Sequence, residues 1–148
     1  MKYLSIPKEI VDAMRTEKRD AFGHDVETHI AGEDGYGPCR CCLKQFKPGE
    51  DRLLFSYAPV GADHPYDEVG PVYVHADCAP YTGTHEFPPE VKKGRCPIPL
   101  VLRSYDRNRR MIDALFVKNN DDVEAVIREL FERQEISFLH VRNAVAQC

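Results

Sequence analysis

The chain has 148 residues, of which 43% are hydrophobic and 30% are charged, a composition typical of a soluble globular protein. At this length we expect a single domain over residues 1–148, with a core that forms without metals or disulfides. The 24 acidic and 20 basic residues give a net charge of −4. This balance argues against a nucleic-acid partner, because nucleic-acid binders carry an excess of positive charge. No apolar run approaches the ~20 residues of a membrane span, so we expect no membrane association.

The predicted elements of the first half are one helix and two strands. Apolar residues at helical spacing after Pro7 predict a helix over residues 7–19. Clustered glycines and prolines predict loops over residues 32–38 and 58–70. The other expectations are strands over residues 53–57 and 72–75, and no long regular element over the proline-rich residues 79–99.

The last third predicts two strands, a helix and a strand. Residues 100–105 and 111–117 are expected to form strands joined by a polar turn over residues 106–109. We expect Asn120 or Asp121 to cap a helix over residues 121–133, since Glu124 follows Asp121 at the spacing of a capping box. A final strand is expected over residues 136–141. The fold class is therefore α+β, with a mainly antiparallel sheet, an N-terminal helix and a C-terminal strand–strand–helix–strand unit.

The N-terminal residues predict a cytoplasmic protein. A signal peptide contains an apolar run of about 7–15 residues, and Pro7, Lys8, Glu9 and Asp12 interrupt any such run. Thiols stay reduced in the cytosol, where clustered cysteines are more often metal ligands or reactive thiols than disulfides. The sequence contains six cysteines: Cys39, Cys41, Cys42, Cys78, Cys96 and Cys148.

Two pairs of residues have the spacing of zinc ligands. Cys39-x-x-Cys42 is followed, after 32 intervening residues, by His75-x-x-Cys78. Structural zinc takes four nitrogen or sulfur ligands in a tetrahedron, and a two-residue gap lets one tight turn direct two ligands at one ion. The predicted strand, loop and strand between the pairs would return the second pair to the first. This arrangement resembles a treble-clef site, so we predict a zinc-binding sub-site over residues 39–78.

Two alternatives to zinc remain open for these four residues. Free cysteine is often buried and packs as a small hydrophobic residue, and a disulfide is the other alternative. Cys41 is additional to the four ligands and would be able to replace Cys39.

A second candidate site combines Arg103, Tyr105, His140 and Arg142. Alternate residues of a strand share one face, so each pair points in one direction, and two guanidinium groups beside a histidine would bind a carboxylate or phosphate. The alternative is a solvated sheet face paired with acidic residues. A catalytic pair is also conceivable, with Cys39 or Cys148 as the nucleophile and His140 as the base.

Several short motifs together resemble a known family. They are Cys39-Arg40-x-Cys42-Leu43, Pro48-Gly49-Glu50, Gly70-Pro71-Val72-Tyr73-Val74-His75, Leu102-Arg103-Ser104-Tyr105-Asp106 and His140-Val141-Arg142-Asn143-Ala144. In this order they resemble the domain of unknown function family numbered 1203, from about residue 38 to the C-terminus. The resemblance implies a small bacterial α+β protein and no established reaction. It also implies a rival arrangement, in which Cys39 and Cys148 meet and Cys39 is not a metal ligand. Gln147 departs from the family pattern, which has glycine there.

From these observations we predict a cytoplasmic, non-enzymatic protein with a structural zinc site on Cys39, Cys42, His75 and Cys78. It would act as a binding or interaction module for a protein or small-molecule partner. The alternative is a small enzyme or anion-binding protein that uses the arginine, histidine and cysteine residues near the C-terminus.

Overall fold

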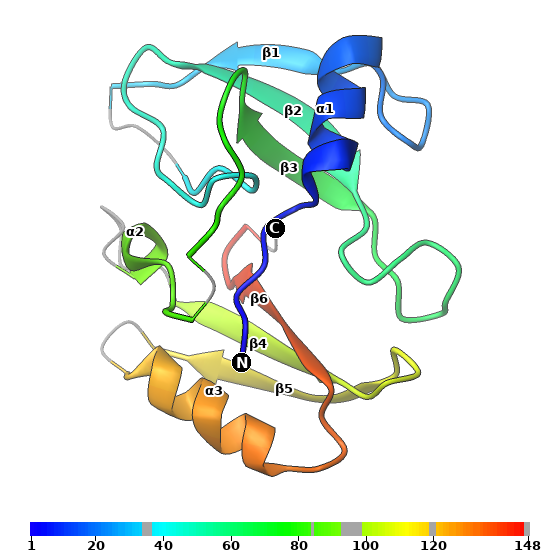
Figure 1. Ribbon diagram of the computed structural model, residues 1–148, viewed down its shortest axis with the longest axis vertical. Coiled ribbons are helices and arrows are strands. Elements are labelled where there is room, and N and C mark those ends of the chain that lie inside the picture. The colour runs from blue at the N-terminus through cyan, green and yellow to red at the C-terminus, as the bar shows by residue number, and fades with distance from the viewer. Residues whose placement is uncertain (34–36, 84, 93–98, 119–120, 147–148) are drawn as a thin grey trace. The chain divides into compact units, whose positions relative to one another are not determined.

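The computed structural model describes residues 1–33, 37–83, 85–92, 99–118 and 121–146 (Figure 1). These residues form two three-stranded antiparallel sheets, with strand orders β1-β2-β3 and β5-β4-β6. The chain divides into two compact units, the first comprising Met1–Tyr57 and Gly70–Arg95 and the second Ala58–Val69 and Cys96–Cys148. The predicted α+β class and antiparallel pairing are confirmed. The single domain over residues 1–148 stays a prediction.

The first unit contains α1 (Lys8–Glu17), β1 (Glu27–Ile30), β2 (Asp51–Tyr57), β3 (Gly70–His75) and the short α2 (Pro89–Lys92). Helix α1 ends where Lys18 adopts a left-handed conformation, with φ of 55°, and its N–H donates to the Met14 carbonyl. Strand β1 was not predicted, because its four residues are mostly exposed and carry no apolar alternation.

The core of the first unit contains the cysteine cluster. Helix α1 contributes Val11 and Met14, and β2 and β3 contribute Leu53, Phe55 and Val74. The remaining members are Ile6, which precedes α1, and residues of the segment between β1 and β2, which include Cys39, Cys41, Cys42 and Phe46. A metal bound by these thiols would therefore lie inside the apolar core that joins α1 to the sheet.

The second unit contains β4 (Leu100–Tyr105), β5 (Met111–Val117), α3 (Val123–Glu132) and β6 (Phe138–Asn143). This is the predicted order of strand, strand, helix and strand. Helix α3 begins slightly later than expected, because the Asp122 carboxylate caps it by accepting from the N–H groups of Glu124 and Ala125. Asp121 instead accepts from Lys118 N, and the other predicted cap, Asn120, lies outside the described residues.

Strand β6 also begins later than predicted. Ile136 N donates to the Arg133 carbonyl at 3.1 Å, so Ile136 belongs to the turn after α3, where its side chain is buried. The apolar character of Ile136 therefore reflects core packing of the turn and not strand pairing.

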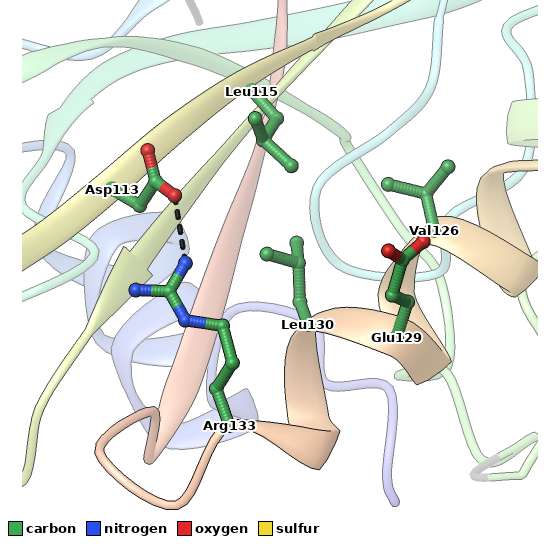
Figure 2. Close-up of a pocket in the computed structure, with 6 residues that line it drawn as sticks. All are labelled: Asp113, Leu115, Val126, Glu129, Leu130 and Arg133. Atoms are coloured by element: carbon green, nitrogen blue, oxygen red, sulfur yellow. Dashed lines mark hydrogen bonds and ion pairs between the residues drawn. The ribbon is translucent and has the colours of Figure 1, made fainter.

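The two faces of the sheet in the second unit differ in character. Leu102 and Ser104 of β4 are fully buried on one face, and Ile127 and Leu130 of α3 are also buried. Figure 2 shows α3 beside this face, where Leu115 of β5 lies close to Leu130. The opposite face carries the alternate residues, including Arg103. None of the helices in the described residues is long and apolar enough to cross a membrane.

Candidate metal centre

A tight turn holds the first pair of cysteines. Cys39 N donates to the Lys44 carbonyl at 2.8 Å, and Leu43 N donates to the Cys39 carbonyl at 2.9 Å. The turn closes through Leu43, whose φ of 58° lies in the left-handed region. A side chain at Gly37 would place its Cβ 2.9 Å from the Gln45 Cα, so only glycine fits where the chain enters the turn.

The β2–β3 hairpin returns the second pair of residues to this turn. His75 ends β3 and pairs with Arg52 near the start of β2. The turn is attached to β3 by a hydrogen bond from Arg40 N to the Tyr73 carbonyl at 2.9 Å. Cys78 follows three residues after His75, in irregular chain. A treble clef normally places its second pair at the start of a helix, and here residues 79–83 are irregular instead.

The four predicted ligands form a compact group. One ligand atom from each of Cys39, Cys42, His75 and Cys78 lies within 4.8 Å of all the others. The Cys39 Sγ to Cys78 Sγ distance is 3.9 Å, and the Cys42 Sγ to His75 Nδ1 distance is 3.4 Å. Tetrahedral zinc, with Zn–S bonds near 2.3 Å, requires about 3.8 Å between two sulfurs and about 3.6 Å between sulfur and nitrogen. These two distances are close to the requirement, and the other pairs of ligand atoms lie within 4.8 Å.

Cys41 lies outside this group although its side chain is fully buried. Burial raises the pKa of the Cys41 thiol, and a hydrogen bond with Cys78 raises it further. Cys39, Cys41, Cys42 and Cys78 are all free thiols. The structure therefore brings Cys39, and not Cys41, together with the other three candidate ligands.

The electrostatics of the first pair favour a thiolate. The Cys42 thiol, and N–H groups that include those of Cys42 and His75, donate to Cys39 Sγ and hold the pKa of Cys39 well below its ordinary value. The same hydrogen bond raises the pKa of Cys42. The two sulfurs thus share one proton, which a bound cation would displace.

Glu50 orients the histidine. Its Oε2 lies 3.2 Å from His75 Nε2, on the side of the ring away from Cys42. A proton on Nε2 that is donated to Glu50 leaves the Nδ1 lone pair directed at the cysteines, as in the carboxylate–histidine–metal arrangement of many zinc proteins. The Phe46 ring lies 4.2 Å from the imidazole and restricts its rotation.

Arg15 of α1 supplies a positive charge beside the cluster. Its Nη2 donates to the His75 carbonyl at 2.8 Å and to Cys78 Sγ at 3.2 Å. Three thiolates and one divalent cation sum to a charge of −1, which the Arg15 guanidinium balances. Sequence reasoning did not identify Arg15, because it precedes Cys78 by 63 residues and lies on another element. Glu50 was detectable as part of the turn motif that follows the cysteines.

The other predicted cluster lies on one face of the second sheet. Arg103 pairs with His140, and Val101 pairs with Arg142, so both arginines and the histidine occupy the same face. Tyr105 shares this face, but it is only 1% exposed and stacks on Phe138 with ring centroids 5.0 Å apart. Cys148, the other predicted nucleophile, lies outside the described residues.

A small pocket lies on the face of this sheet that α3 covers. It has a volume of about 160 Å³ and is lined by residues of β5 and α3 (Figure 2). Ligand pockets usually measure about 300–1,000 Å³. Arg133 and Asp113 form an ion pair across the pocket at 2.7 Å. The small size and the ion pair that spans it argue against a ligand site.

The fold and the cluster define a small α+β protein with a Cys₃His group that is able to hold a metal ion. The family model for proteins of unknown function designated DUF1203 matches residues 36–148, and the chain belongs to this family. The resemblance seen in the sequence motifs is thereby confirmed. No curated protein and no solved structure matches the chain.

Proposed function

We propose that Cys39, Cys42, His75 and Cys78 bind one zinc ion as a structural site, and that the protein acts as a binding or interaction module in the bacterial cytoplasm. The observation that carries the proposal is the convergence of the four ligand atoms within 4.8 Å of one another. The clustered thiols suit a compartment that keeps cysteines reduced, which supports the cytoplasm, and the family resemblance supports a bacterial origin.

The donor set favours zinc over other common metals. Thiolate and imidazole ligands suit zinc, whereas calcium and magnesium prefer oxygen ligands. Three sulfurs and one nitrogen form a common structural zinc set. The Glu50 carboxylate is held by His75 Nε2 and by Lys47 N at 2.7 Å, so it supports a ligand and is not a ligand itself.

A structural role for the ion follows from the number of ligands. Catalytic zinc usually has three protein ligands and keeps a position for water or substrate, whereas four protein ligands complete the tetrahedron. Cys39 and Cys42 are also buried in the core of the first unit. Zinc would therefore stabilise this unit and the surface that it presents to a partner.

Elemental analysis of protein purified without an affinity tag tests this proposal. We expect about one zinc ion per chain, retained in Cys41→Ser and lost in Cys42→Ser. The two variants are matched, since both remove a buried thiol from the same turn and only Cys42 belongs to the group. Metal-free wild-type protein, or equal zinc loss in both variants, would contradict the proposal.

A further inference from the structure

Two arginines in the second unit converge on a single carboxylate oxygen. Arg103 of β4 and Arg142 of β6 project from the same sheet face, and the Nη1 of each donates to Glu68 Oε2. The two guanidinium side chains are only 21% and 10% exposed, whereas that of Glu68 is 49% exposed. The cationic groups are thus fixed in the fold, and the anionic group lies on the solvent side.

We propose that Arg103 and Arg142 form a binding site for the carboxylate or phosphate group of a small molecule, and that Glu68 occupies this site when no ligand is bound. Guanidinium groups recognise both anions through paired N–H donors. In the present contact, the two arginines direct their Nη1 atoms at one shared oxygen. A phosphate, or a carboxylate with both oxygens turned to the arginines, offers more than one oxygen to the two guanidinium groups.

Local charge supports an anionic ligand despite the net charge of −4 of the whole chain. Two guanidinium groups face the single carboxylate of Glu68. His140 lies on the same face, directly opposite Arg103 in the strand register, and places a third nitrogen-bearing side chain at the site. The stacked rings of Tyr105 and Phe138 continue this face as a packed apolar surface.

Glu68 can leave the site without unfolding its loop. The loop over residues 58–69 is organised by Asp67, whose Oδ2 accepts from Asp63 N at 2.7 Å and from His64 N at 2.6 Å. Arg109 ties the same loop to the β4–β5 turn by donating to the Val60 carbonyl at 3.2 Å and to Asp63 Oδ1 at 2.6 Å. Because these contacts do not involve Glu68, rotation of its side chain alone vacates the volume of one carboxylate group.

Calorimetric titration of the full-length protein as purified, with inorganic phosphate and, separately, with succinate, tests the site. An internal carboxylate competes with the ligand, so Glu68→Gln should bind at least one of these anions about tenfold more tightly than the wild type. Tighter binding of phosphate alone would identify a phosphate ligand, and tighter binding of succinate alone a carboxylate ligand. Adding Arg103→Gln to Glu68→Gln should abolish the binding, and adding Arg103→Lys should weaken it, since lysine keeps the charge but loses the paired donors.

Asp63→Asn is the matched control, because it removes another arginine–carboxylate contact of the same loop but lies outside the proposed site. It should bind both anions as the wild type does. The proposal is overturned if Glu68→Gln binds neither anion more tightly, if Asp63→Asn gains as much, or if the gain survives Arg103→Gln. Circular dichroism of each variant confirms folding, and the more exposed Arg103 is substituted in preference to the buried Arg142. The site lies wholly in the second unit, so its failure would leave the zinc proposal untouched.

Discussion

Replacing Glu50 by glutamine should weaken zinc binding without removing a ligand. The carboxylate lies 3.2 Å from His75 Nε2 and is itself held by Lys47 N at 2.7 Å, which fixes it in place to receive the histidine proton. Hydrogen bonds from the backbone N–H of Lys47 and from the His75 side chain lower the pKa of Glu50, so the carboxylate is ionised at neutral pH. Glutamine keeps the shape of the Glu50 side chain but loses the negative charge that favours the Nε2-protonated tautomer of His75.

Loss of such an orienting group typically lowers metal affinity by about 10- to 100-fold, or about 1.4–2.7 kcal/mol. Competition with a chromophoric chelator at neutral pH measures this change. Glu27→Gln is a matched control, because Glu27 pairs with His29 Nε2 at 2.8 Å in the same unit and neither residue belongs to the ligand group. Equal affinity of Glu50→Gln and wild type, or an equal loss in Glu27→Gln, would refute the orienting role.

Three further predictions concern folding. Chelation of zinc should raise hydrogen exchange in the first unit while residues 100–141 stay protected, since the cysteines belong to the core of the first unit only; loss of protection in both would contradict this. Burial alone would raise the pKa of Asp20, but hydrogen bonds from the N–H groups of His24, Ser56 and Phe22 lower it to about 2. Asp20→Asn should therefore lower the free energy of unfolding in urea by about 2 kcal/mol above about pH 4. The loss should shrink as the pH falls towards 2, because a depressed pKa stabilises the fold only while the group is ionised. A loss that does not depend on pH would contradict this prediction. Asp122→Ala removes the α3 cap and should lower the free energy of unfolding by about 1 kcal/mol, and an unchanged urea midpoint would refute the capping role.

Much of the second unit could be predicted from the sequence because its signals are local. The strands β4 and β5 have the predicted bounds, since apolar runs and a polar turn delimit them. Helix α3 begins later than predicted because the adjacent residues Asp121 and Asp122 compete as caps, and only the tertiary arrangement decides between them. The strand β1 was missed because it is short and exposed at the edge of its sheet.

The candidate sites also combine local features, which the sequence predicts, with long-range contacts, which it does not. The ligand spacing is a local signal, so the sequence predicted which cysteines and histidine would converge. Their supporting residues depend on long-range packing, as the contact of Arg15 with Cys78 illustrates. The arginine cluster was expected from strand periodicity, but Glu68 lies 35 residues before Arg103 and its approach to the sheet has no sequence signal.

X-ray absorption at the zinc edge of the tag-free protein identifies the ligands of the metal ion directly. We expect three sulfurs at about 2.3 Å and one nitrogen at about 2.0 Å around the zinc, with the nitrogen contribution lost in His75→Ala. A shell with an oxygen ligand, with four sulfurs including Cys41, or with no change in His75→Ala would contradict a closed site on Cys39, Cys42, His75 and Cys78.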